Sequence, residues 1–202
     1  MTKVIDVEQG SEEWLRLKLS IISASEFKRA ISKGQTFKNY LVEKVTGAIL
    51  DKVEVIELEN FDWGHEQEES ARTLYEFIKG DRVDLAGIGV LDDSGYIGAS
   101  PDGLVGTSGC IEVKSPAASK KHVEAMLYGM PSEHKPQIQG VMWVWEREWC
   151  DFISYDPRFP TKEIYIERVH RDDKYINDVL EPKVNEAALT FEAAMEKLKN
   201  EH

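Results

Sequence analysis

Apolar and polar residues recur with two different periods along the chain, and the period changes at Gly80. Before this glycine, apolar positions repeat at helical spacing. Four helices are therefore expected. The first is capped by Ser11, the second is capped by Ser23 or Ser25, the third covers about 36–50, and the fourth covers the segment FDWGHEQEESARTLYEFIKG. In this fourth helix Asp62 is the expected N-cap, and Gly80 is the expected terminator.

After Gly80 the pattern becomes typical of short antiparallel strands separated by Gly, Asp, Ser and Pro. Strands are expected over 82–91, 96–101, 103–106, 110–115, 149–155 and 162–169, with helices around 119–128 and 133–146. A last packing helix starts near Asp173, where Pro182 kinks or restarts it. The order predicts an α/β domain with a central mixed β-sheet flanked by helices, spanning 1–202 as one domain.

Composition narrows the class of protein. The chain has 202 residues, 42% of them hydrophobic, which is enough for one domain with a sizeable core. It has no apolar run long enough for a membrane span and no apolar signal-peptide core, so a cytoplasmic protein is expected. The two cysteines, Cys110 and Cys150, form no CxxC pair, which argues against a disulfide framework or a cysteine zinc site.

The net charge of −12 argues against nucleic acid as a partner, but the charge is unevenly placed. Residues 16–44 hold seven basic and two acidic side chains, whereas 51–69 hold eight acids and one lysine. A solvated face explains most runs of this kind. The alternative is a protein whose basic first quarter meets DNA while its acidic body repels it.

Three charged residues, Asp102, Glu112 and Lys114, stand close together in the stretch IGASPDGLVGTSGCIEVKSP. SPDG by itself suits a type I turn. On a strand, Glu112 and Lys114 share one face, and burying either charge unpaired is costly. The pair therefore indicates either an exposed edge strand with a local ion pair or a charged cleft beside a central strand.

The fourth helix supplies a further carboxylate. Glu68 continues the apolar stripe of Ala71, Tyr75 and Ile78, so it is either directed at the core or lies at a partly exposed end of the stripe. Two carboxylates about 4 Å apart repel by roughly 4 kcal/mol at an effective dielectric near 20. Three acids need more neutralisation than one lysine provides, and oxygen ligands favour Mg²⁺ or Mn²⁺ over zinc.

The spacing of SPDG and EVK has the PD-(D/E)xK nuclease form, and the flanking text is more specific. WGHEQEESARTLYEF resembles the G-x-x-x-E helix of the phage lambda exonuclease family, with Glu68 at its acidic position. ISAS, PQIQGVMWV, YDPRFP and DDKYI resemble further segments of that family in the same order, so the resemblance covers about 8–177. The sequence is similar to the lambda-type alkaline exonucleases.

This resemblance implies a restriction-endonuclease-like core that holds two Mg²⁺ ions, with Mn²⁺ as an alternative. Asp102 would bridge the ions, while Glu112 and the Val113 carbonyl would complete the ligands of one of them. Two such cations stabilise the attacking and departing oxygens of an in-line phosphodiester displacement. By the same resemblance, Lys114 would orient or deprotonate the attacking water.

The remaining catalytic candidates implied by the resemblance are Glu68 and Gln137, which would hold metal-bound waters or the lysine. Gln137 shares a helical face with Val141 and Val144, so an amide directed at the core is the alternative.

The resemblance also implies a pocket for a 5′-terminal phosphate. The matching positions are Lys18, Ser25 and Lys120, with His65 nearby and Arg16 as a further contributor. Lys18 stands where the family has arginine, which keeps the charge but loses the bidentate fork. His65 stands where lambda exonuclease has a lysine, and it would be only partly charged near neutral pH. Phe61 is either a wedge that splits the terminal base pairs or a core aromatic.

The function implied is a Mg²⁺-dependent 5′→3′ exonuclease that acts on double-stranded DNA ends and releases mononucleotides. It would leave 3′ single strands for a single-strand annealing protein, in the cytoplasm of a bacterial host that carries the phage or prophage. The family also implies a homotrimer ring around DNA. The alternatives are a restriction-type or structure-specific endonuclease, and a catalytically inactive DNA-end-binding module.

Overall fold

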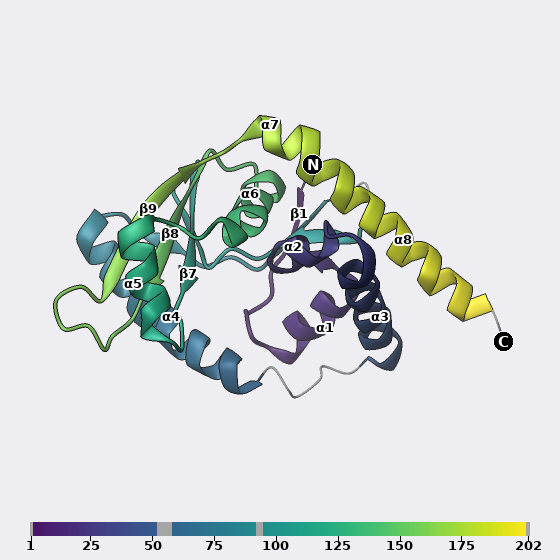
Figure 1. The fold of residues 1–202 in the computed structure, drawn as a ribbon, viewed down its shortest axis with the longest axis horizontal. Helices are drawn as coiled ribbons and strands as arrows, with labels where there is room; N and C mark the ends of the chain where they lie inside the picture. The colour runs from purple at the N-terminus through teal and green to yellow at the C-terminus, as the bar shows by residue number, and fades with distance from the viewer. Residues whose placement is uncertain (1, 52–57, 92–94, 201–202) are drawn as a thin grey trace.

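The computed structural model describes residues 2–51, 58–91 and 95–200, and for 58–66 it describes the backbone alone. Figure 1 shows the fold. In chain order the elements are β1 (Thr2–Ile5), α1 (Glu12–Ser20), β2 (Ile22–Ser23), the 3-10 turn η1 (Ala24–Glu26), α2 (Phe27–Ala30), α3 (Gly34–Leu50), α4 (Leu58–Lys79), β3 (Val83–Asp84), β4 (Ile88–Leu91), β5 (Ile97–Ala99), β6 (Gly103–Val105), β7 (Gly109–Lys114), α5 (Ser119–Tyr128), the 3-10 turn η3 (Ser132–His134), α6 (Lys135–Val144), β8 (Trp149–Tyr155), β9 (Ile164–His170), α7 (Asp173–Tyr175), the π-helical turn η4 (Ile176–Leu180) and α8 (Glu181–Asn200).

The strands form two mixed sheets, one with the order β1-β4-β5-β2 and the other with the order β3-β6-β7-β8-β9. The predicted α/β class with mixed pairing and flanking helices is confirmed, but two sheets take the place of the single central sheet that was expected. Pairing is parallel between β2 and β5 and between β7 and β8, and antiparallel between the other neighbours.

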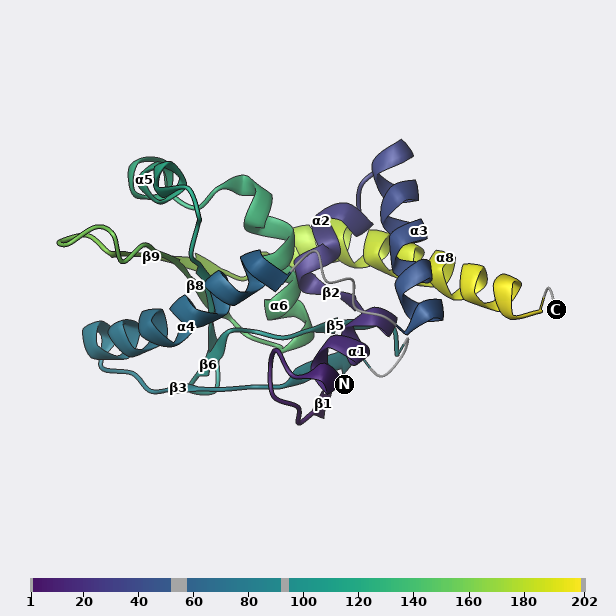
Figure 2. The same ribbon diagram turned by 90° about the horizontal axis from the view of Figure 1, so that it is seen from below.

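The five-stranded sheet is covered on both faces. Figure 2 shows α4 and α5 on opposite sides of β8 and β9. On one face Ala71 and Tyr75 of α4 pack in a cluster with Ile111 of β7, and on the other face Ile138 of α6 packs with Phe152 of β8. The strand β7 is therefore central and buried on both sides, which excludes the exposed edge strand.

Several helix boundaries follow local signals in the sequence. The hydroxyl of Ser11 accepts a 3.2 Å hydrogen bond from the Trp14 N–H and so caps α1 as expected. Gly80 ends α4 with a φ of 72° and donates its N–H to the Glu76 carbonyl. The predicted N-cap at Asp62 is wrong, because α4 already begins at Leu58 and this residue lies inside the helix. Leu58 and Glu59 are good helix formers, so α4 begins one turn before Asp62.

The C-terminal helical segment runs along α2 and α3, away from the five-stranded sheet (Figures 1 and 2). A π-helical turn over Ile176–Leu180 precedes Pro182, which stands in the first turn of α8. In this turn the Glu181 N–H donates to the Ile176 carbonyl, and Pro182, which has no N–H to donate, follows directly after it. Within the described residues, none of the helices is both long and apolar enough to span a membrane.

Candidate active site

The β6–β7 hairpin brings two acids of the motif together. Gly103 pairs with Ile111 across the hairpin, so Asp102, immediately before β6, lies beside the middle of β7. The Oδ2 atom of Asp102 accepts a 2.7 Å hydrogen bond from the backbone N–H of Val113. Glu112, one position earlier on the central strand, is only 1% exposed. Antiparallel pairing thus places the two carboxylates at one point of the sheet.

Two donors meet at one oxygen of Glu112. The ammonium of Lys114 donates to Glu112 Oε1 at 2.6 Å, and the side-chain amide of Gln137 donates to the same oxygen from α6. The other oxygen, Glu112 Oε2, is buried and has no hydrogen-bond partner among the described residues. The predicted ion pair between Glu112 and Lys114 is present, but the strand that carries it is covered on both faces and is not an exposed edge strand.

Glu68 reaches this cluster from α4. Ala71 and Tyr75 are fully buried on the same helical face, and they hold that face against the sheet. Glu68 and the hairpin acids line one cavity of about 260 Å³. Eight of the predicted site residues line it: Glu68, Asp102, Glu112, Val113, Lys114, Gln137, Lys18 and Ser25. Residues that are distant along the chain therefore converge on one small space.

The acids strongly influence one another's protonation. Burial, and then the charge of Glu68, raises the pKa of Asp102 to about 7, against the opposing effect of Lys114. Burial, and then the charge of Asp102, raises the pKa of Glu112 to about 7. The pKa of Glu68 is also raised, by burial and then by Glu112. The cluster carries more negative charge than its surroundings neutralise.

The acids also raise the pKa of Lys114, which favours the charged form of the lysine. Burial of the ammonium would lower the pKa of Lys114, but the neighbouring Glu112 and Asp102 carboxylates raise it above its usual value. The lysine is therefore a cation that neutralises part of the cluster. Lys114, with further contributions from Arg72 and Lys18, offsets only part of the repulsion among the acids, whose pKa values stay raised.

The cavity offers oxygen atoms that could bind a divalent cation. Among the side chains that the structure describes, no group of three or more His, Cys, Asp or Glu residues is arranged so that it could hold a metal ion by itself. Two buried carboxylates and the neighbouring Val113 carbonyl are nevertheless oxygen donors of the kind that Mg²⁺ prefers, together with water. The unpartnered Glu112 Oε2 is one such donor. The residues fit a partly hydrated hard cation better than a fully protein-caged one.

The predicted phosphate ligands Lys18 and Ser25 lie in the same cavity. The ammonium of Lys18 stands 4.3 Å from the centre of the Trp14 ring, a cation–π contact that restricts the lysine. The Ser25 hydroxyl shares a 2.7 Å hydrogen bond with the Ser23 hydroxyl. A cation and a hydroxyl therefore stand beside the acidic cluster, at the end of the cavity formed by α1 and η1.

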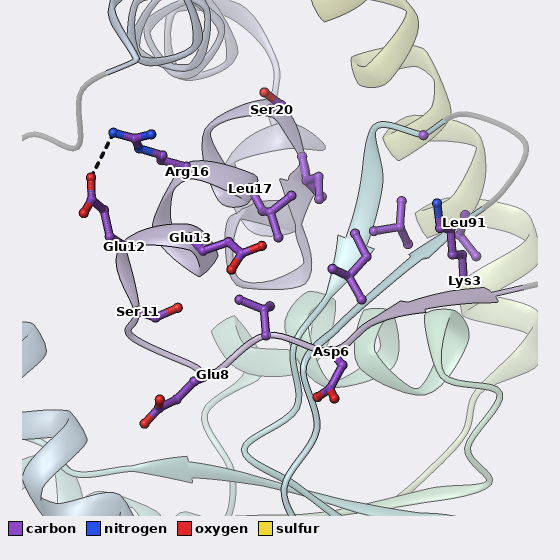
Figure 3. Close-up of a pocket in the computed structure, with 15 residues that line it drawn as sticks. Lys3, Asp6, Glu8, Ser11, Glu12, Glu13, Arg16, Leu17, Ser20 and Leu91 are labelled. Carbon is purple, nitrogen blue, oxygen red and sulfur yellow. Dashed lines mark ion pairs between the residues drawn. The ribbon is translucent and has the colours of Figure 1, made fainter.

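Two of the other predicted DNA-binding residues are placed elsewhere. Arg16 pairs with Glu12 at 2.9 Å and lines a separate cavity of about 1140 Å³ between β1, α1 and β4 (Figure 3). Lys120 is outside both cavities, has a side chain that is 79% exposed, and lies 3.9 Å from Glu124. Helical spacing at the surface explains both ion pairs. The side chains of Phe61 and His65 lie outside the described residues.

Three residues of the cavity wall were missed at the sequence level. Gln9 and Trp14 both donate to the Ser100 hydroxyl, at 2.7 and 3.2 Å, and all three line the cavity. Ser100 in turn donates to the Gly87 carbonyl. The only local signal that these residues belong to the site is the position of Ser100, two residues before Asp102. The pattern around Trp14 predicts an ordinary core residue.

A second buried network anchors α4. The Tyr75 hydroxyl donates to Asp151 at 2.8 Å, and Arg168 donates two hydrogen bonds to the same carboxylate at 2.8 and 2.9 Å. Asp151 is fully buried on β8. The network ties the helix that carries Glu68 to the strand that pairs with β7.

The model of the YqaJ-like viral recombinase domain matches residues 13–148, a range that contains all five catalytic candidates. The chain belongs to the YqaJ-like viral recombinase family. Within this family the resemblance to alkaline exonucleases noted in the sequence is confirmed, because the chain is 33% identical to one over 94% of its length.

Solved structures similar to this chain include the alkaline exonuclease LHK-Exo from Laribacter hongkongensis. The two share 33% identity with a TM-score of 0.84, over 94% of this chain and 96% of that chain. The same enzyme in complex with dAMP gives a TM-score of 0.83, with the same identity and coverage. A phage-related exonuclease from Haemophilus somnus 129PT shares the fold, with 16% identity and a TM-score of 0.68 over 88% of this chain and 96% of that chain.

No curated protein sequence matches the chain significantly. Family membership and the likeness to LHK-Exo support the assignment of this chain as a nuclease that acts on DNA.

Proposed function

We propose that the protein is a Mg²⁺-dependent 5′→3′ exonuclease that degrades one strand of double-stranded DNA from its ends. The observation that carries this proposal is the convergence of Glu68, Asp102 and Glu112 with a lysine in one cavity. The structure of the similar LHK-Exo with dAMP adds support, because a deoxynucleoside monophosphate is what such an enzyme would release.

Asp102, Glu112 and the Val113 carbonyl are the residues that would hold two Mg²⁺ ions, with water completing their coordination. When bound, the ions would supply charge stabilisation of the phosphoryl group and activation of water. Mn²⁺, a similarly hard cation, is expected to substitute.

The chain's own residues then have separate tasks. Lys114, an ammonium held 2.6 Å from Glu112, neutralises that carboxylate and orients the attacking water. Gln137 holds the same Glu112 oxygen from α6 and so fixes the rotamer of this buried acid. Glu68, which lines the same cavity, would accept hydrogen bonds from metal-bound water.

Lys18 and Ser25 bind the 5′-terminal phosphate in the proposed reaction. Both line the cavity, and a cation with a hydroxyl donor suits a phosphate dianion. Holding the terminal phosphate next to the acidic cluster would place the first phosphodiester bond at the reacting position, which makes cleavage dependent on an end. Digestion of one strand leaves a 3′ single strand.

In the proposed assembly three copies form a ring around DNA and together carry a charge of −36, that is 3 × −12. Basic residues of the first quarter of the chain would face the duplex, and the acidic outer surface would keep the ring from binding DNA elsewhere. The 3′ strand would pass to a single-strand annealing protein of the same phage or prophage, in the cytoplasm of the bacterial host.

The experiment that tests this function follows linear duplex DNA labelled at either the 5′ or the 3′ end, with Mg²⁺ or with a chelator. Early release of the 5′ label as a mononucleotide, only with Mg²⁺, is expected. Asp102→Asn should abolish release, while Asp178→Asn, at an exposed position of η4, serves as the matched control.

Covalently closed circular DNA separates the competing functions. An end-dependent exonuclease leaves the circle intact, whereas cleavage of the circle would establish an endonuclease instead. Binding of linear duplex without any release of nucleotide would identify an inactive DNA-end-binding module.

A further inference from the structure

A buried ammonium lies behind the Lys18 and Ser25 end of the cavity. The side chain of Lys44, on α3, is only 7% exposed. Its Nζ atom donates to the backbone carbonyl of Lys18 at 2.6 Å, and to Glu26 Oε1 and Oε2 at 3.1 and 2.8 Å. All three acceptors come from two segments, the end of α1 and the turn η1.

Glu26 extends the connection to the serines. Its Oε2 atom also accepts the backbone N–H of Ser23 at 3.0 Å, as part of a capping box around η1. The Ser23 hydroxyl in turn shares a hydrogen bond with the Ser25 hydroxyl. One ion pair therefore joins the backbone of Lys18 to the turn that presents Ser25.

The energetics favour a role beyond stability. Removing an ammonium and a carboxylate from water is expensive, and apolar residues of similar volume often stabilise a fold equally well or better. Here the pair uses its hydrogen bonds to fix the distance between two backbone segments that share no strand pairing in the described sheets. Such a geometric constraint is most useful where two ligand-binding side chains must act together.

We propose that Lys44 and Glu26 are positioning residues, which hold Lys18 and Ser25 at the spacing required to grip a 5′-terminal phosphate. The inference rests on the proposed function, since it assigns Lys18 and Ser25 to that phosphate. Neither Lys44 nor Glu26 lines the cavity, so both act through the residues that they hold.

The test compares degradation of a linear duplex with 5′-phosphate ends and of the same duplex with 5′-hydroxyl ends, in Mg²⁺. Wild-type protein is expected to prefer the phosphorylated ends in kcat/KM. Lys44→Met should reduce this preference about tenfold, the scale of one misaligned charged hydrogen bond. The loss should arise on phosphorylated ends, while the rate on hydroxyl ends changes little.

Arg168→Met is the matched control for lost stability. It also removes a cation from a buried carboxylate, that of Asp151, but on β8 and β9, away from the Lys18 and Ser25 end of the cavity. This variant should lower the melting temperature and keep the wild-type preference for phosphate. A similar loss of preference in the control would show that general destabilisation, and not positioning, explains the result.

A double-mutant cycle tests the route of action. If Lys44 works through Lys18, then Lys44→Met added to Lys18→Met should cause no further loss of the phosphate preference. Additive losses would overturn the inference. Should Lys44→Met fail to fold, Glu26→Gln should lose the preference and Lys44→Arg, which keeps a cation against Glu26, should retain most of it.

Two results distinguish this inference from the function on which it rests. A wild-type preference for phosphate that survives both Lys44→Met and Glu26→Gln would refute the positioning role alone. A wild-type protein that degrades both kinds of end equally would remove the terminal-phosphate pocket itself, and the positioning role with it.

Discussion

The backbone N–H of Val113 donates a 2.7 Å hydrogen bond to Asp102, across a β-hairpin that separates the two residues by eleven positions. This bond fixes the orientation of the carboxylate before any ligand arrives. It also explains why the aspartate and the EVK segment must share one hairpin. A shift of the β6–β7 register by one residue would turn Glu112 to the opposite face of the sheet.

Asp102→Asn should abolish nuclease activity and stabilise the protein in the absence of Mg²⁺. The asparagine oxygen can still accept the Val113 hydrogen bond, while the buried charge with its raised pKa is removed. We expect the free energy of unfolding at pH 8 to rise by about 1 kcal/mol or more. Urea denaturation measures this change, and a clear loss of stability would contradict the described environment of Asp102.

Stability without Mg²⁺ should decrease as pH rises from about 4.5 to about 7. Asp102 and Glu112 titrate near 7 in the folded protein but near their usual values of 3.8 and 4.5 when unfolded, so the folded state binds more protons between these limits. Above pH 7 the full penalty applies, and Mg²⁺ should relieve it. Melting temperatures should therefore rise more with Mg²⁺ at pH 8 than at pH 5.5; an equal rise would argue against these acids as ligands.

The two glutamines of α6 should respond differently to substitution. Gln137 donates to Glu112 in the cavity, whereas the buried Gln139 donates to the His170 carbonyl and accepts from the Asp172 N–H. Gln137→Leu should lower kcat about tenfold to hundredfold with little change in stability. Gln139→Leu should cost about 1–3 kcal/mol of stability and leave kcat unchanged. The reverse pattern would exchange their assigned roles.

Arg158→Ala should lower the free energy of unfolding at neutral pH, because it leaves the Asp156 carboxylate without its ion-pair partner. Hydrogen bonds from Arg158 lower the pKa of the buried Asp156 to about 2, and the same guanidinium donates to the Pro116 and Ala117 carbonyls. The carboxylate therefore contributes stability above about pH 4, which is lost as pH falls through about 2. Chemical denaturation of both proteins at pH 7 and pH 3 should show the difference narrowing in acid.

The sequence alone was sufficient for most elements, because their signals are local. A capping serine, a terminating glycine and a change of hydrophobic period each act within a few residues, so α1, the end of α4 and most strands after Gly80 were predictable. The single strand expected over 82–91 was wrong, because this segment divides into β3 and β4 in different sheets, and β7 pairs with β8 in parallel where antiparallel pairing was expected. Asp62 was misassigned as an N-cap because helix propensity extends upstream of it. The short strands β1 and β2 were missed, since two to four residues carry no periodicity.

Site residues divide in the same way. Asp102, Glu112 and Lys114 stand within one hairpin, and Glu68 and Gln137 belong to helical patterns, so their types and spacing could be recognised along the chain. Only the tertiary structure separates Lys18 and Ser25, which reach the cavity, from Arg16 and Lys120, which do not. All four are polar residues near the surface, and local sequence does not encode which of them faces the acids.

The sequence alone thus determined the family and the acidic motif through short-range spacing, and the α/β class through hydrophobic periodicity. Both signals are local, so they can be recognised along the chain without the tertiary structure. Packing decided the rest. The contacts of Lys44 with Glu26 and of Trp14 with Ser100 join residues 18 and 86 positions apart, and such pairs form only when several elements have docked. The cavity therefore exists as a property of the assembled layers, not of any single segment.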